Sequence, residues 1–223
     1  MFNQRVTVLV GAYGSGKTEI AINMVQQLAP QYAEIAIADL DIVKPYFRTR
    51  EFRLKLTQQN IRVIMPSEEL AYADLPALTP EVDAVLQNQT IKLILDVGGD
   101  DAGATALARY SQYFTAAGYD MLMVINTCRP FAKTPEEIVE MKQRIEARSR
   151  LTITGLVSNS NLGAETTGET ILNGHRIIQQ VATLTGVPIA FTAVDNRLLP
   201  EIKENVDGAI FSLTRQVLPP WER

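Results

Sequence analysis

Cysteine, histidine and tryptophan are almost absent from this sequence of 223 residues, which contains one of each. A single cysteine, Cys128, excludes a disulfide bond within the chain and any metal site built from several cysteines of one chain, and it favours a reducing compartment. The one histidine, His175, has no serine or carboxylate partner indicated by its sequence neighbours. We therefore expect His175 to be a polar residue on a helix surface and not a catalytic base.

Runs of lysine or arginine are also missing, and the net charge is −4 with a pI near 5.2. This balance argues against a surface that binds nucleic acid or anionic lipid. No apolar stretch approaches the roughly 20 residues that a membrane-spanning helix requires, and the first residues do not resemble a signal peptide. We expect a cytoplasmic protein that contacts neither nucleic acid nor a membrane.

Apolar strand-like runs alternate with helical stretches along the whole chain, which predicts a mostly parallel sheet with helices on both faces. The predicted strands lie near Val6 to Val10, Glu34 to Ala38, Arg62 to Met65, Lys92 to Val97, Met121 to Asn126, Thr152 to Val157 and Pro188 to Phe191. The predicted helices span Thr18 to Leu28, Phe47 to Gln59, Pro80 to Gln87, Ala102 to Ala117, Pro135 to Arg150, Gly168 to Thr185 and Pro200 to Val217. We interpret residues 1–223 as one domain.

The octet Gly11-Ala12-Tyr13-Gly14-Ser15-Gly16-Lys17-Thr18 directly follows the first apolar run and fits the pattern G-x-x-x-x-G-K-[ST] of a phosphate-binding loop. Its glycines allow consecutive backbone N–H groups to curl around a phosphate. The Lys17 ammonium can then bind the β- and γ-phosphates, and the Thr18 hydroxyl can ligate Mg²⁺. The sequence therefore predicts a nucleotide-binding site at the start of the first helix.

Carboxylates follow two other strands. Asp96 ends the run Ile94-Leu95-Asp96-Val97-Gly98-Gly99, and we predict that it holds the hydration shell of Mg²⁺. The backbone N–H of Gly99 is then placed to sense the γ-phosphate. Asp39 and Asp41 end the second predicted strand at the sheet edge where open α/β folds bind ligands. Asp39 is a further candidate metal ligand, and Asp41 is a candidate to position the attacking water.

These features, together with Val124-Ile125-Asn126-Thr127, Gly155 to Asn159 and Ala193-Val194-Asp195-Asn196, resemble the SIMIBI class of P-loop NTPases in its MinD/ParA/CobQ-type branch. The resemblance spans almost the whole chain. It implies a three-layer α/β P-loop NTPase fold with a mainly parallel sheet of seven or eight strands. It also implies Thr18 and Asp96 around Mg²⁺ and Asp41 orienting the water.

The same resemblance implies that Asn159 reads the adenine ring while the backbone around Val194 and Asp195 lines its other side. Guanine recognition normally uses an Asn-Lys-x-Asp box, and the corresponding Asn159-Ser160-Asn161-Leu162 has neither the lysine nor the aspartate. We therefore expect ATP and not GTP. An alternative is that Asn159 and Asn161 are ordinary turn residues at the end of a strand.

The sequence departs from this branch at Ala12. The loops of MinD and ParA proteins have a lysine at this position, and that lysine reaches the phosphates bound to the partner subunit. In a homodimer of this chain, the cross-subunit charge would have to come from Lys44, Arg48 or Arg129. In this respect the loop looks more like the loops of UreG-like GTPases.

The functional prediction is a Mg²⁺-dependent ATP-binding protein, a slow ATPase that acts as a nucleotide-controlled switch for a protein partner. Catalysis would rest on positioning and charge neutralisation without a covalent intermediate. Two alternatives stay open. One is a small-molecule kinase or ATP-dependent ligase of the dethiobiotin synthetase/CobQ type, and the other is an ATP sensor without turnover.

Overall fold

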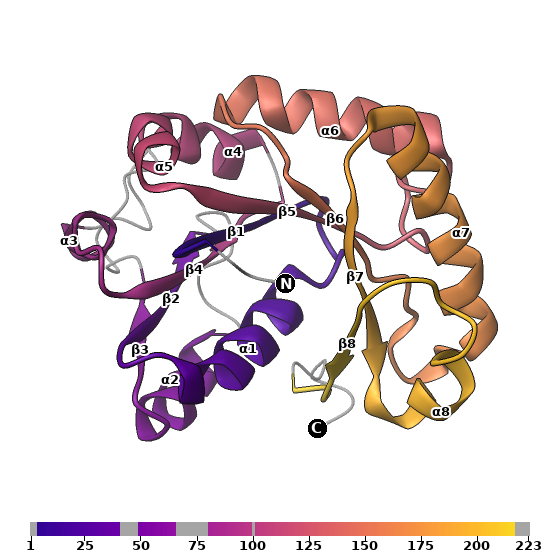
Figure 1. Ribbon diagram of the computed structural model, residues 1–223, viewed down its shortest axis with the longest axis horizontal. Helices are drawn as coiled ribbons and strands as arrows, with labels where there is room; N and C mark the ends of the chain where they lie inside the picture. The colour runs from indigo at the N-terminus through magenta and orange to yellow at the C-terminus, as the bar shows by residue number, and fades with distance from the viewer. Residues whose placement is uncertain (1–3, 41–48, 66–79, 100, 217–223) are drawn as a thin grey trace.

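The computed structural model describes residues 4–40, 49–65, 80–99 and 101–216, and an eight-stranded parallel sheet forms its centre (Figure 1). The strands are β1 (Val6–Val10), β2 (Ile35–Leu40), β3 (Ile61–Ile64), β4 (Lys92–Val97), β5 (Tyr119–Ile125), β6 (Gly155–Ser158), β7 (Ile189–Asp195) and β8 (Ile210–Leu213). Their order across the sheet is β3-β2-β4-β1-β5-β6-β7-β8, and every neighbouring pair is parallel. The predicted fold class is confirmed.

Helices cover both faces of the sheet (Figure 1). They are α1 (Lys17–Leu28), α2 (Thr49–Gln58), α3 (Pro80–Gln87), α4 (Asp101–Ala108), α5 (Ser111–Ala117), α6 (Pro135–Ser149), α7 (Gly168–Thr185) and α8 (Leu199–Ile202). Apolar residues of α1 and α2 pack on one face, and those of α3 to α7 on the other. The adjacent residues Val8 and Leu9 of β1 belong to opposite cores and are both fully buried. Burial on both faces explains why the strands are apolar without alternation.

The chain order places the phosphate-binding loop between two other strand ends. It follows β1, which lies between β4 and β5 in the sheet. Because all strands are parallel, the loops after β4, β5, β6 and β7 emerge at the same edge as this loop. Within the described ranges, no helix has both the length and the apolar character needed to reach across a bilayer.

The helix predicted for Pro200 to Val217 is wrong. The structure has the short helix α8, then Gly208 with a φ of 96°, and then the edge strand β8 paired with β7. Phe211 and Leu213 are buried and alternate with half-buried neighbours, which is the period of a strand. Ile202, Val206 and Ile210 have helical spacing and pack in one apolar cluster, but Ile202 ends α8 and Ile210 begins β8. Gly208 was the sequence signal against a continuous helix.

The predicted surface position of His175 is also wrong, because the residue is buried with 3% of its surface exposed. Its Nδ1 and the Thr192 hydroxyl of β7 form a hydrogen bond of 2.9 Å. Burial lowers the pKa of His175 below its ordinary value, and the charge of Asp207 opposes that effect. That His175 is not a catalytic base stays a prediction.

Candidate functional site

The phosphate-binding loop connects β1 to α1 and has the backbone that its motif predicts. Gly11, Gly14 and Gly16 all have positive φ angles, of 141°, 74° and 93°. Helix α1 begins at Lys17, so its positive N-terminal end faces the loop. The loop can therefore present backbone N–H groups and a helix terminus to an anion.

Lys17 is buried, with 8% of its surface exposed, and its ammonium group folds back on the loop. Lys17 Nζ donates hydrogen bonds to the carbonyl oxygens of Gly11, at 3.0 Å, and Ala12, at 2.9 Å. The hydroxyl of the neighbouring buried residue Ser15 has no hydrogen-bond partner among the described residues. A cationic group and an unpaired hydroxyl inside a curled loop form a polar cradle that suits a phosphate.

The predicted magnesium ligands are brought together by the sheet. Thr18 Oγ1 donates to Asp96 Oδ2 at 2.6 Å. Asp39 and Asp96 are paired in register on the adjacent strands β2 and β4, and their exposed fractions are only 6% and 4%. Two carboxylates on neighbouring strands at one edge of the sheet can bind the same divalent cation.

The donor set fits Mg²⁺, which binds oxygen ligands and typically uses only one or two carboxylates while retaining several waters. Thr18, Asp39 and Asp96 supply a hydroxyl and two carboxylates at one edge of the sheet. Among the described residues, no group of three or more histidine, cysteine, aspartate or glutamate side chains gathers in a metal-binding arrangement. Mg²⁺ bound here would complete its coordination with water and phosphate oxygens, and its binding stays a prediction.

Gly99 lies against the backbone of the phosphate-binding loop. A Cβ atom at Gly99 would come within 2.6 Å of the backbone nitrogen of Tyr13 and 2.9 Å of the Ala12 carbonyl carbon. Only glycine permits this approach. The segment after β4 and the phosphate-binding loop are thus in direct contact, as a phosphate-sensing role for Gly99 requires.

The loops after β5 and β6 are joined to the phosphate-binding loop by asparagine side chains. Asn159 is buried, and its Nδ2 donates to the Ser15 carbonyl oxygen at 2.7 Å. Asn126 Nδ2 donates to the Asn161 carbonyl, and Asn161 Nδ2 donates to the Asn159 carbonyl. The observed partner of the Asn159 amide is thus the loop backbone, and its contact with adenine stays a prediction.

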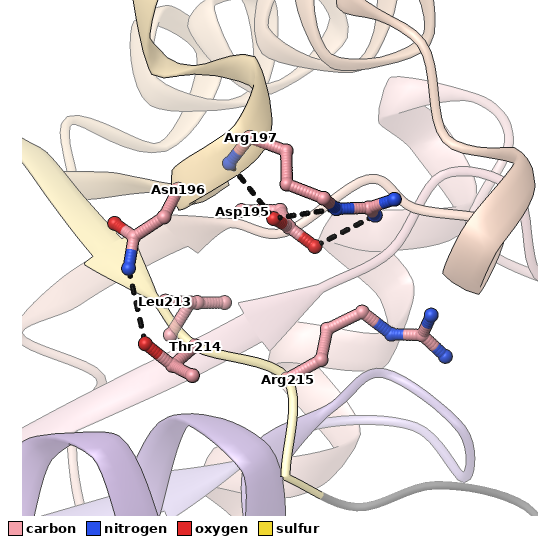
Figure 2. Close-up of a pocket in the computed structure, with 6 residues that line it drawn as sticks. All are labelled: Asp195, Asn196, Arg197, Leu213, Thr214 and Arg215. Atoms are coloured by element: carbon pink, nitrogen blue, oxygen red, sulfur yellow. Dashed lines mark hydrogen bonds and ion pairs between the residues drawn. The ribbon is translucent and has the colours of Figure 1, made fainter.

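A pocket of about 340 Å³ lies at the ends of β7 and β8 (Figure 2). It is lined by Asp195, Asn196, Arg197, Leu213, Thr214 and Arg215. The predicted base-binding residue Asp195 lines it, whereas Val194 is 1% exposed and packs in a core with α7 and α8. A contribution of Val194 to a ligand would therefore come from its backbone, as predicted.

Sequence reasoning missed two arginines of this pocket. Asp195 Oδ1 accepts from the backbone N–H and the Nε of Arg197, both at 3.0 Å, and Oδ2 accepts from the guanidinium at 2.8 Å. These bonds hold the pKa of the Asp195 carboxyl below its ordinary value, although partial burial opposes them. Arg215 extends to the same side as Arg197 in Figure 2 and lies close to the loop after β6 at Gly163. The sequence signal for these two arginines was their position, because Arg197 and Arg215 each lie shortly after an apolar run.

Asp41, which was predicted to orient water, lies outside the described residues, and so do Lys44 and Arg48. Of the predicted site residues that the structure describes, Asp39, Asp96, Gly99 and Asn159 lie around the phosphate-binding loop. Asp195 lies at the end of β7, farther along the same edge of the sheet.

Comparison with known proteins finds similarity in fold. No protein-family model and no curated protein sequence matches the chain. Solved structures of FtsY do match, with TM-scores of 0.59 for Thermotoga maritima at 18% identity and 0.57 for Mycoplasma mycoides at 15% identity. The Thermotoga match covers 86% of this chain and 62% of that one, and the Mycoplasma match 87% and 61%.

The signal recognition particle receptor FtsY of Elizabethkingia anophelis also matches, with a TM-score of 0.51 and 16% identity over 84% of this chain and 57% of that one. The chain thus spans about 60% of the length of the structures it matches. At these identities the likeness concerns the fold alone. Together with the phosphate-binding loop and the strand order, it shows that the chain has the fold of the SIMIBI-class P-loop NTPases.

Proposed function

We propose that this protein binds Mg²⁺-ATP, hydrolyses it slowly, and uses the bound nucleotide to control its affinity for a protein partner. The observation that carries the proposal is the 2.6 Å hydrogen bond between Thr18 Oγ1 and Asp96 Oδ2, directly after a phosphate-binding loop with glycines of positive φ. This contact unites the last residue of the motif with the carboxylate at the end of β4. Both groups were predicted from the sequence as Mg²⁺ ligands.

Each residue has a distinct task in this function. Backbone N–H groups of residues 12–17 and the Lys17 ammonium bind phosphate oxygens. Thr18, Asp96 and Asp39 hold Mg²⁺, which neutralises charge on the phosphate oxygens when it is bound. Asp41 orients the attacking water. These groups position and neutralise without forming a covalent intermediate, and we expect slow turnover where no partner adds further positive charge in the transition state.

The preference for ATP over GTP is supported by the loops after β6 and β7, where we expect the nucleotide base to bind. A carboxylate that reads guanine must accept hydrogen bonds from the base, and the ion pair of Asp195 with Arg197 reduces the acceptor capacity that this carboxylate has left. The loop after β6 also lacks the lysine and the aspartate of a guanine-reading box. We therefore assign adenine to this side, with Asn159 and the backbone of Val194 and Asp195 as its contacts.

The switch is supported by the contacts of the segment after β4. Gly99 touches the phosphate-binding loop at Tyr13, and a Cβ atom on Gly103 of α4 would lie 2.6 Å from the Gly98 carbonyl oxygen. A change in the loop on phosphate binding therefore acts directly on this segment and, through it, on α4. Binding energy that differs between the two nucleotide states is what such a switch requires.

The first test is nucleotide binding by the purified protein, measured by titration calorimetry with ATP and GTP in the presence and absence of Mg²⁺. We expect ATP to bind more tightly than GTP, Lys17→Ala to abolish binding, and Asp96→Asn to remove its dependence on Mg²⁺. Absence of ATP binding, or equal binding by Lys17→Ala, would overturn the proposal.

Hydrolysis is tested by phosphate release from Mg²⁺-ATP across a range of protein concentrations, with Lys17→Ala as the blank for contaminating activity. Release above the blank supports a slow ATPase, and a specific activity that rises with concentration indicates that a homodimer completes the site. Tight binding with no release under any of these conditions would contradict the hydrolytic part of the proposal.

A further inference from the structure

Arg129 belongs to the loop after β5, and its guanidinium group lies on the phosphate-binding loop of its own chain. Arg129 Nε donates a hydrogen bond to the Gly14 carbonyl oxygen at 3.2 Å. A Cβ atom at Gly14 would lie 3.3 Å from the same nitrogen and 3.7 Å from the guanidinium carbon. An exposed arginine side chain therefore rests on a glycine at the centre of the motif.

The backbone that carries Arg129 is held by a turn. Arg129 N donates to the Asn126 carbonyl oxygen at 3.0 Å, and Asn126 Oδ1 accepts from Cys128 N, also at 3.0 Å. Asn126 Oδ1 accepts as well from Asn161 N at 3.1 Å, which ties this turn to the loop after β6. Such preorganisation lowers the entropic cost of fixing a long side chain beside a ligand.

Within the described part of the chain, one of the hydrogen-bond donors of Arg129 has a partner. A guanidinium carries five N–H donors, and the Nε–H is the one directed at Gly14. Among the residues that the structure describes, none accepts from the four donors on the two terminal nitrogens, and no carboxylate forms an ion pair with them. These donors form the fork that binds phosphate oxygens in a bidentate manner.

The negative charge of a bound nucleotide would attract the guanidinium group of Arg129. A nucleoside triphosphate keeps negative charge after one divalent cation has bound, and Lys17 offsets only part of it. Position 12 in the loop is alanine, so no second lysine is available within the motif. Among the described residues, Arg129 is a cationic side chain in contact with this loop from outside the motif.

We propose that Arg129 binds phosphate oxygens of the nucleotide in cis, from the same chain, and supplies the positive charge that Ala12 does not. This inference rests on the proposed nucleotide binding. It differs from the sequence-based expectation that Arg129 would act, if at all, on a second subunit. Nucleotide binding by a single copy of the chain then needs no charge from a partner.

The test compares the affinity for Mg²⁺-ATP of wild type, Arg129→Ala, Arg129→Lys and Arg129→Gln, measured by displacement of a fluorescent ATP analogue at low ionic strength. We expect Arg129→Ala to weaken binding by about tenfold or more, in line with the loss of a charge-assisted hydrogen bond. Arg129→Lys keeps the charge and restores part of the affinity, whereas Arg129→Gln keeps an N–H donor for Gly14 but no charge and restores little. The matched control is Arg144→Ala, an exposed arginine on α6, which leaves affinity unchanged.

The outcomes separate this inference from the function on which it rests. Wild-type affinity in Arg129→Ala overturns the assignment of Arg129 alone, while a wild-type protein that binds no ATP overturns the proposed function as well. Equal affinities of the Lys and Gln variants mean that Arg129 only braces the loop, which also overturns the inference.

An equimolar mixture of Arg129→Ala and Lys17→Ala distinguishes the two possible geometries. Recovery of high-affinity sites in the mixture would show that Arg129 acts across subunits and would overturn the cis assignment. We expect no recovery, because each impaired site would need both residues from its own chain.

Discussion

Lys92 is a buried cation at the edge of the sheet opposite the phosphate-binding loop. It begins β4, and 1% of its surface is exposed. Its Nζ donates to the Gln4 carbonyl oxygen at 2.5 Å and to the Thr7 hydroxyl at 3.1 Å, and lies 5.8 Å from the centroid of the Tyr32 ring. Burial lowers the pKa of Lys92 to about 8, although the charge of Asp120 raises it.

The lowered pKa predicts a specific dependence of stability on pH. Between about pH 8 and the ordinary pKa of lysine, the unfolded chain binds more protons at Lys92 than the folded one, so the free energy of unfolding rises with pH. The contribution is at most about 1.4 kcal/mol per pH unit. Urea unfolding of wild type and Lys92→Met at several pH values from 7 to 10 isolates it, because other titrating groups are common to both proteins.

We expect wild type to gain stability relative to Lys92→Met as the pH rises above 8, and the difference to be constant below pH 7. Parallel curves over the whole range would show that Lys92 titrates normally in the folded protein. Nucleotide affinity serves as the control and is expected to be equal in both proteins, since Lys92 lies at the other edge of the sheet.

At the scale of single elements, helix α7 shows how tertiary contacts override local propensity. Gly174 lies in its interior, where alanine would ordinarily be more favourable by about 1 kcal/mol. A Cβ atom at this position would overlap the side chain of Ser160 and lie 3.0 Å from the Thr127 hydroxyl. Ser160 Oγ in turn is hydrogen-bonded to the Thr127 hydroxyl at 2.8 Å.

Gly174→Ala is therefore expected to destabilise the protein by about 1–3 kcal/mol, the usual cost of overpacking, instead of stabilising it. The measurement is the midpoint of chemical unfolding. Gln180→Ala, at an exposed position of the same helix, is the matched control and should change stability by about 0.5 kcal/mol or less. A Gly174→Ala protein as stable as that control would contradict the packing argument, and adding Ser160→Gly is expected to recover part of the loss.

Element prediction from the sequence was most accurate at the central strands β1 and β4, which were identified with their observed bounds. The fully buried strand β6 was predicted from Thr152 to Val157, and it spans Gly155–Ser158. The prediction failed at β8, an edge strand in which only alternate residues are fully buried. The predicted helix from Ala102 to Ala117 is divided into α4 and α5. A continuous apolar run in the sequence identified the central strands. The edge strand β8 and the division between α4 and α5 depend on contacts with other elements.

At the scale of the whole molecule, we expect bound Mg²⁺-ATP to raise the free energy of unfolding. Mg²⁺-ATP at 100 times its dissociation constant adds about 2.7 kcal/mol to the free energy of unfolding. For a chain of this size that corresponds to a rise in Tm of roughly 5–10 °C. The measurement is thermal unfolding with and without Mg²⁺-ATP, with Lys17→Ala as control.

The rise is expected to disappear in Lys17→Ala and to shrink when Mg²⁺ is removed with a chelator. A rise of the same size in Lys17→Ala would place the bound ATP outside the phosphate-binding loop. A rise that survives chelation would argue against Thr18, Asp39 and Asp96 as metal ligands.

The sequence by itself determined the parallel α/β class, the phosphate-binding loop and the carboxylates that end β2 and β4. These features depend on local patterns: apolar runs buried on both faces, glycines that allow positive φ, and polar residues directly after strands. Their roles in binding ATP remain predictions.

Only the tertiary structure decided which of these segments meet. The order β4-β1-β5 places Asp96 on one side of the phosphate-binding loop and Arg129 on the other, although both are remote from it in sequence. The burial of His175, the bonding of Asp195 to Arg197 and the pairing of β8 with β7 likewise depend on contacts between elements. Such contacts leave no local pattern, because each residue is compatible with several environments until the fold selects one.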